Sequence, residues 1–280
     1  MQEHNNIQQA LVSSTAFARR MRIDVLNMVY RARASHVGSC FSIIDILAVL
    51  YGQVMQVHPH EPSWSGRDRF ILSKGHAAAA VYAALANIGV IPRAALETYG
   101  ADGSPFMTHV SHKVAGVEFS SGSLGHGLPF GVGKALAAKM SGQAWRVFVL
   151  LSDGEMDEGT NWEALMFAAH HRLDNLVAVI DYNKLQSLTS ISQTLGLEPL
   201  VDKLTAFGWD VREVDGHGHL AMASDLGSTP WVTGRPSLLI AHTTKGKGVS
   251  FMENKVEWHY RSPSAAQLSL ALAELECGHA

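Results

Sequence analysis

The chain has 280 residues, of which 47% are hydrophobic and 17% charged, so it can bury a substantial core and is too apolar for disorder. Lys and Arg number 22 and Asp and Glu 25, and the formal net charge of −3 gives no electrostatic basis for binding nucleic acid. No uninterrupted apolar run of about 18 residues predicts a membrane span, and the polar N-terminus does not resemble a signal peptide.

Cysteine and histidine usage differ sharply. Only Cys40 and Cys277 occur, which is no disulfide framework, so we expect a cytoplasmic protein. Histidine occurs 15 times. Because imidazole titrates near neutral pH and ligates metals, this high histidine count needs an explanation in terms of proton transfer, metal binding or structure.

The first part of the chain is mainly helical. Apolar residues at helical spacing predict a helix over Ile7–Arg33 and a second over Ser42–Tyr51, with Ser42 as its N-cap. A short strand is predicted at Arg69–Leu72, and an Ala-rich helix follows His76.

Strands and helices alternate in the remainder. Four more strands are predicted, at Arg146–Leu151, Leu176–Asp181, Val211–Val214 and Leu238–His242, with helices at Asn161–His171 and Ala265–Glu276. Short strands that are apolar on both faces and separated by helices indicate a doubly wound α/β fold, a parallel sheet with helices on both faces. No long linker rich in Pro, Gly and Ser occurs, so residues 1–280 are expected to form a single domain.

Acidic residues follow one predicted strand. The segment 151–159 reads LSDGEMDEG, so Asp153 and Gly154 lie just past the strand. A carboxylate there can hold a hard cation, and glycine lets backbone approach a ligand. The alternative is an acidic turn at the start of a helix, where negative charge is favoured.

The next strand favours the cation. Asn183 follows it, thirty residues after Asp153, which is about the length of a strand–helix–strand unit. Both side chains then stand at the carboxyl ends of parallel strands, where ligands bind. One carboxylate, one amide oxygen and a backbone carbonyl suit Mg²⁺ or Ca²⁺ bridging to phosphate oxygens.

An acidic-Gly turn followed after about thirty residues by Asn is similar to the thiamine diphosphate motif, and segment 152–186 resembles that of transketolases. Four further segments resemble the same family in the same order, namely RASHVGSC at 33–40, SKGH at 73–76, GVEFSSGSLGHG at 116–127 and TTKGKG…EWH at 243–259. The resemblance covers about residues 15–262 and implies the thiamine-diphosphate-binding fold.

The resemblance implies a metal and cofactor site. Asp153 and Asn183 match side-chain ligands of Mg²⁺ (or Ca²⁺), and Leu185 matches the carbonyl ligand. The residues implied to bind thiamine diphosphate are His76, Gly122, Leu124, Gly154, Glu155, Asn183 and His259.

The resemblance also implies catalytic residues. His76 and His259 match histidines near the diphosphate and the reacting carbon. His36 and His109 match histidines that touch the donor sugar and shuttle protons, and Glu158 matches an acid at a subunit interface. Thiamine chemistry moves protons at each step, which accounts for part of the histidine excess.

Several positions depart from the family pattern. Ser152 replaces the first Gly of Gly-Asp-Gly, Ser123 the loop Pro, and His126 the loop Gln. The His-Pro-Glu segment reads His-Val-Ser at 109–111 and is followed by His112. These departures lie close to the expected donor channel.

Transketolases are more than twice this long, and this chain resembles only the half that binds the diphosphate. The resemblance therefore implies the N-terminal subunit of a split transketolase, paired with a C-terminal, pyrimidine-binding subunit in a self-associating heterotetramer. We expect transfer of a two-carbon ketol unit between sugars or sugar phosphates, with neither nucleic acid nor membrane as partner. The chain alone is then expected to be inactive.

Other functions remain open at this stage. One is the alpha subunit of a 2-oxo acid dehydrogenase or related thiamine enzyme, and another is a non-catalytic paralogue. The pair His217 and His219 permits a metal site, but its Gly-rich surroundings favour a turn before a helix.

Overall fold

Five parallel strands form one sheet in the computed structural model, which describes residues 2–277, with side chains from Ser14 onward. The strands are β1 (Arg69–Leu72), β2 (Val147–Ser152), β3 (Leu176–Tyr182), β4 (Asp210–Asp215) and β5 (Ser237–His242). Their order across the sheet is β1-β2-β3-β5-β4. Each predicted strand is confirmed to within one residue at either end.

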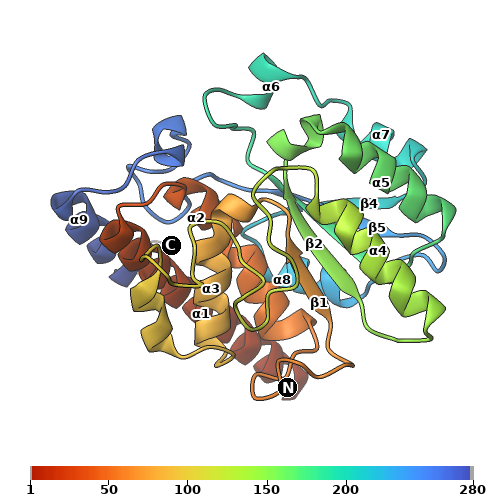
Figure 1. Ribbon diagram of the computed structural model, residues 1–280, viewed down its shortest axis with the longest axis horizontal. Helices are drawn as coiled ribbons and strands as arrows, with labels where there is room; N and C mark the ends of the chain where they lie inside the picture. Colours follow the sequence, from red (N-terminus) through yellow and green to blue (C-terminus); the bar gives the residue numbers. More distant parts are fainter. Residues whose placement is uncertain (1, 278–280) are drawn as a thin grey trace.

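Side chains alternate between the two faces of the sheet. Phe70 and Leu72 belong to one core cluster, and Ile71 between them belongs to another. Helices cover both clusters, so the sheet lies between two helical layers (Figure 1). The expected doubly wound α/β class is confirmed.

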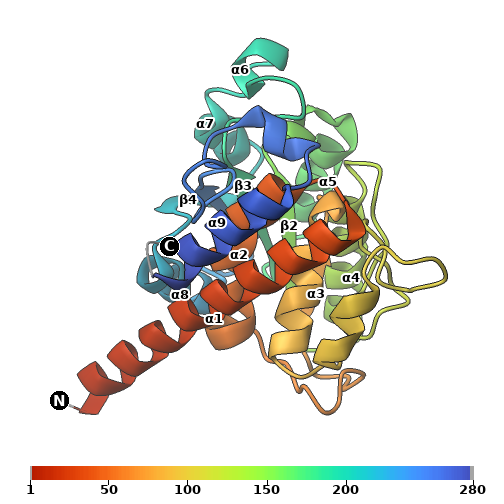
Figure 2. The same ribbon diagram turned by 90° about the vertical axis from the view of Figure 1, so that its left-hand side faces the viewer.

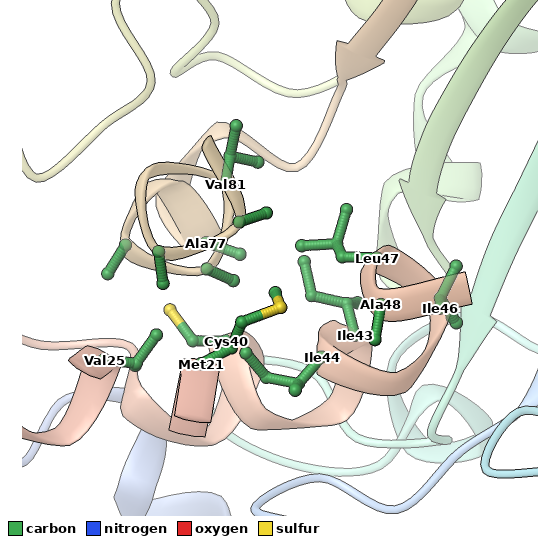
Figure 3. Packing of buried hydrophobic residues seen from close by; sticks show 14 of the residues in the cluster. Met21, Val25, Cys40, Ile43, Ile44, Ile46, Leu47, Ala48, Ala77 and Val81 are labelled. Carbon is green, nitrogen blue, oxygen red and sulfur yellow. The ribbon is translucent and has the colours of Figure 1, made fainter. Parts of the chain in front are cut away.

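The first layer contains the two ends of the described chain. Its helices are α1 (Gln2–Ala32), α2 (Val37–Val49), α3 (Ala78–Asn87), α8 (His219–Gly227) and α9 (Ala265–Glu276). Helix α9 begins at a capping box of Ser264 and Gln267 and lies along α1 (Figure 2). Every residue of α2 is buried, and Figure 3 shows its aliphatic side chains packed against α1 and α3.

The second layer covers the opposite face with α4 (Gly127–Met140), α5 (Gly159–His170) and α7 (Leu200–Ala206). The helical turn Leu50–Val54 directly continues α2. Other short helical turns are Gly75–Ala77, Arg93–Thr98, Gly154–Asp157, Ile191–Thr194 (α6) and Val256–His259. Three of them, at Gly75–Ala77, Gly154–Asp157 and Val256–His259, carry predicted site residues.

Two local predictions were wrong. Helix α2 begins at Val37 with His36 as N-cap, so Ser42 is an interior residue. Its hydroxyl donates to Asp181 at 2.7 Å, a long-range contact that outweighs its capping preference. Strand β4 is not apolar on both faces, because it lies at the sheet edge and buries only Val214.

One stretch, Val37–Val54, is long and apolar enough to cross a membrane by length and composition alone. Within the fold 89% of that stretch is buried, so it has the surroundings of a core helix. The sequence contained no uninterrupted apolar run there because Ser39, Ser42 and Asp45 interrupt it.

We expect Leu47→Ala to lower the free energy of unfolding by about 2–5 kcal/mol, because Leu47 is fully buried and its removal leaves a cavity. Urea denaturation measures this change. The matched control is Leu270→Ala on α9, whose side chain is 59% exposed, and a change of less than about 0.5 kcal/mol is expected there. Equal losses in the two variants would contradict the core assignment.

Candidate active site

A cavity of about 260 Å³ opens at the carboxyl ends of β2 and β3. The register pairs Ser152 with Asp181, so the residues that follow the two strands lie side by side. Asp153 follows β2, and Asn183 follows β3. This edge of a parallel sheet is where ligands of doubly wound proteins bind.

Most of the predicted site residues lie around this one cavity. The residues from the predicted set that line it are His36, His76, His109, Gly122, Leu124, Asp153, Gly154, Asn183, Leu185 and His259. They come from segments far apart in sequence, joined here by the crossovers of the sheet. Their roles stay predictions, whereas their proximity is a property of the fold.

Asp153 is held by backbone. Its carboxylate accepts hydrogen bonds from the N–H of Gly154 at 2.7 Å and from the N–H of Lys184. Burial, reinforced by the charge of Asp181, raises the pKa of Asp153 to about 7. A cation at this carboxylate would relieve both effects, because it compensates the buried negative charge.

Oxygen atoms next to Asp153 complete a set that fits a divalent cation. Asn183 donates through Nδ2 to Asp181 at 3.1 Å, which orients its amide, and Oδ1 accepts from the Leu185 N–H at 3.1 Å. Among the described side chains, residues 14–277, no three His, Cys, Asp or Glu side chains form a metal site on their own. A cation here would complete its coordination with ligand oxygens, as phosphate-bound Mg²⁺ does.

Gly154 is required at its position by a close approach. A Cβ there would lie 2.7 Å from Cγ of Gln186, which is shorter than real contacts. The backbone next to Asp153 therefore packs directly against the segment after β3, which brings both segments to the cavity.

Four imidazoles gather on the other side of the cavity. Ring centroids of His76, His109 and His259 lie 5.1, 5.7 and 5.1 Å from that of His36. His36 has a φ of 76°, which is unusual for a residue with a side chain. Its N–H donates to the carbonyl of His259 at 2.8 Å, which ties it in this conformation. Such strained residues concentrate at functional sites.

Burial keeps these imidazoles neutral. Desolvation, followed by the charge of His109, lowers the pKa of His36 to about 4. Desolvation and then Lys245 lower the pKa of His259 to about 3. The pKa of His76 is held well below its ordinary value by burial and Lys74, and burial lowers that of His109. A neutral ring has one N–H donor and one acceptor nitrogen, so it can form hydrogen bonds of both kinds.

Two predicted residues do not line the cavity. Glu155 is buried beneath it and accepts hydrogen bonds from Ser73 and from the Gly125 N–H, joining the loop before α4 to β2. Glu158 is exposed at the N-cap of α5. Glu155 thus supports the site from below, and Glu158 faces outward.

Sequence reasoning missed two lysines that line the cavity. Lys74 forms an ion pair with Asp181 at 2.5 Å, and both side chains are almost fully buried. Lys245 lies 3.0 Å from Nδ1 of His259, and burial followed by Lys74 lowers its pKa to about 8. Their signal was present, because Lys74 lies in SKGH and Lys245 in TTKGKG, but charge alone did not indicate burial. The lysines make the cavity suited to an anion.

The departures from the family pattern fall mostly outside the cavity. Of the departing residues, only Ser152 lines the cavity. Its N–H donates a hydrogen bond to the Glu155 carboxylate at 3.3 Å. Ser123 and His126 are exposed, and His112 is exposed with its ring bonded to Ser120 at 2.7 Å. The substitutions at 112, 123 and 126 therefore leave the lining of the cavity unchanged.

A cavity lined by two buried lysines and by carboxylate and amide oxygens, at the carboxyl edge of a parallel sheet, lies where α/β domains bind their ligands. The family model for the thiamine diphosphate binding domain of transketolase matches residues 13–273. The transketolase of Leishmania mexicana superposes with a TM-score of 0.88 at 28% identity over 94% of this chain, which spans 41% of that protein. The chain therefore belongs to the transketolase family and has its thiamine-diphosphate-binding fold.

Relatives of about the same length as this chain are subunits of transketolases. The chain is 42% identical over 251 residues to an apulose-4-phosphate transketolase subunit of Phocaeicola vulgatus, covering 90% of this chain and 89% of that protein. It is 40% identical over 252 residues to the 6-deoxy-6-sulfo-D-fructose transketolase subunit SqwG of a Clostridium species, covering 90% and 92%. The chain is the counterpart of a transketolase subunit, which implies a partner subunit.

The depressed histidine pKa values predict acid sensitivity. Unfolded histidines bind protons near pH 6.5, whereas His36 and His259 do so only near 4 and 3 when folded. The unfolded chain then binds more protons, so stability falls as pH decreases from about 7 to about 4. His259→Asn should remove part of that decrease in urea titrations at several pH values. The control His60→Asn, at an exposed position, should retain it, and an unchanged slope for His259→Asn would contradict the assignment.

Proposed function

We propose that this chain is the diphosphate-binding subunit of a two-subunit transketolase that transfers a two-carbon ketol unit from a ketose to an aldose. The observation that carries the proposal is the single cavity that joins Asp153, Asn183 and the four histidines. The subunit-length relatives support it, since their names assign them to transketolases.

The names of the subunit-length relatives support an assembly with a partner subunit. Residues 1–280 act as one domain, and a separate C-terminal subunit supplies the pyrimidine-binding half. Two copies of each chain would form a heterotetramer, with Glu158, exposed at the start of α5, at a subunit interface. Free Cys40 and Cys277 support a cytoplasmic location.

The cation and the diphosphate are held on one side of the cavity. Asp153, Asn183 and the carbonyl of Leu185 would ligate Mg²⁺ (or Ca²⁺). Gly154 brings backbone close to the diphosphate, with Gly122 and Leu124 forming part of the wall, and these three residues line the cavity. Lys74 and Lys245 add positive charge to the same region, which favours an anionic group.

The histidines handle protons. Thiamine diphosphate, when bound, supplies an electron sink for the pair released as the carbon–carbon bond of the ketose breaks. His36 and His109 touch the hydroxyls of the donor sugar and exchange protons with them. His76 and His259 face the diphosphate and the reacting carbon. Their low pKa values keep the rings neutral, so each ring presents one N–H donor and one acceptor nitrogen.

A second thiamine function is less well supported. A 2-oxo acid dehydrogenase alpha subunit gives no joint use for the four clustered histidines. The interpretation as a non-catalytic paralogue rested on Ser152, Ser123 and His126, of which only Ser152 lines the cavity.

The donor sugar is to be identified by screening. Relatives whose names carry different ketoses give a panel of donors for that screen.

We expect Asp153→Ala to abolish Mg²⁺-dependent binding of thiamine diphosphate, because it removes a charged ligand without removing core packing. Calorimetric titration of the reconstituted complex with cofactor and Mg²⁺ measures the loss. The matched control is Asp202→Ala on α7, whose carboxylate is exposed and should leave affinity unchanged. Unaltered affinity in Asp153→Ala, with the fold verified by circular dichroism, would overturn the metal site.

The function is tested by titrating Mg²⁺ and thiamine diphosphate into this chain alone and into its mixture with the product of the neighbouring gene. Binding that tightens strongly only in the mixture, followed by ketol transfer from one ketose of the panel, is the expected result. Ketol transfer by the chain alone would refute the proposal that activity requires a second subunit. Absence of binding in both samples would favour the non-catalytic paralogue.

A further inference from the structure

A second buried polar cluster lies outside the cavity, between α1, α2 and α8. The Arg22 guanidinium donates to both carboxylate oxygens of Asp45, at 3.0 and 2.6 Å. The same carboxylate accepts from Nδ1 of His217 at 2.7 Å and from Nε2 of His219 at 3.1 Å. Nδ1 of His219 accepts from Ser14 at 2.9 Å.

This cluster is not the metal site that the pair His217 and His219 permitted, since no group of three or more His, Cys, Asp or Glu suited to a metal ion is found where side chains are described, at residues 14–277. Arg22 lies against the carboxylate that the two rings share, and its positive charge disfavours a cation there. The predicted turn before a helix is confirmed, because α8 begins at His219, and the His219 side chain is buried there.

The cluster holds the segment 243–247 at two points. Nε2 of His217 accepts the N–H of Thr244 at 2.8 Å. Nε of Arg22 donates to the carbonyl of Lys247 at 3.0 Å. Because Nδ1 of His217 must donate to Asp45, its Nε2 is left as an acceptor, so Asp45 fixes the tautomer that holds Thr244.

The segment has no freedom between these two points. The Gly246 N–H donates to the carbonyl of Gly38 at 3.0 Å. Gly246 has a φ of 81°, and a Cβ there would lie 2.4 Å from the carbonyl oxygen of Met252. Lys245 thus leaves the backbone in one direction, into the catalytic cavity.

Lys245 determines which ring nitrogen of His259 carries the proton. Its Nζ lies 3.0 Å from Nδ1 of His259. An ammonium group donates, so Nδ1 accepts and the single proton of the neutral ring resides on Nε2. The path of contacts therefore runs from Asp45 through His217, Thr244 and Lys245 to His259.

We propose that Asp45 and His217 are positioning residues that hold the segment 243–247 so that Lys245 donates to Nδ1 of His259, which fixes His259 as an Nε2–H donor toward the substrate. The pair touches neither cofactor nor sugar and acts only through Lys245. The significance for turnover rests on the proposed function, but the His259 tautomer does not.

Two substitutions separate the bonds of His217. In His217→Asn the shorter amide can still donate to Asp45 but does not reach Thr244. In His217→Gln the longer amide can accept the Thr244 N–H in place of Nε2. The matched control is His60→Gln, at an exposed position in the loop before β1. Thermal unfolding verifies that all three variants fold.

The first measurement is ¹⁵N NMR of the histidine rings in the full chain, where nitrogen shifts distinguish the two tautomers. The wild type, His217→Gln and His60→Gln should show His259 protonated at Nε2. His217→Asn should shift the His259 nitrogens toward a mixture of tautomers. An unchanged His259 signal in folded His217→Asn would overturn the proposal, as would an Nδ1–H tautomer in the wild type.

The second measurement is kcat of the reconstituted complex. His217→Asn should lower kcat about tenfold or more, the range typical of residues that orient a functional group, with the KM for thiamine diphosphate little changed. His217→Gln should recover most of that loss. In a Lys245→Met background the same His217→Asn change should have no further effect, whereas a full additional loss would refute action through Lys245. If the wild-type complex transfers no ketol unit, the proposed function fails, while the NMR result still decides the positioning role.

Discussion

The buried ion pair between Lys74 and Asp181 is the constraint on which the rest of the site depends. Nζ lies 2.5 Å from Oδ2, and the two side chains are 1% and 0% exposed. Breaking such a pair by removing one partner costs about 3–5 kcal/mol, because the other charge stays buried alone. Asp181 also accepts from Ser42, Thr243 and the amide of Asn183, so one carboxylate ties α2, β3 and the segment after β5 together.

That constraint also sets the electrostatics of the cavity. Lys74 is compensated by Asp181, whereas Lys245 has no carboxylate in hydrogen-bond contact among the described side chains, so positive charge is left over beside Lys245. The same desolvation raises the pKa of Asp153 and lowers those of His36 and His259. Burial thus raises the pKa of a carboxylate and keeps the imidazoles neutral within one cavity, and both effects arise because desolvation disfavours the charged form.

Local pattern predicted the elements that are buried by apolar residues alone. The strand Leu176–Tyr182 is apolar up to Ile180 and was predicted to within one residue, and the final helix Ala265–Glu276 was predicted with both ends correct. Ser42 was misassigned because its hydroxyl bonds to Asp181, 139 residues away. The pair His217 and His219 was correctly predicted to lie in a turn before a helix, but its contacts were missed because Asp45 and Arg22 are supplied by other helices.

The sequence by itself determined the doubly wound class, the spacing of Asp153 and Asn183, and the segments that contribute histidines. These depend on hydrophobic periodicity and on motifs of a few residues, which are local. Only the tertiary structure decided that His36 takes a positive φ, that Glu155 supports the cavity from below, and that Lys74 and Lys245 are buried beside the imidazoles. Ion pairing, desolvation and the histidine tautomers depend on which side chains come together at the carboxyl edge of the sheet. The crossover connections between strands bring these side chains together, and no single segment of sequence contains that information.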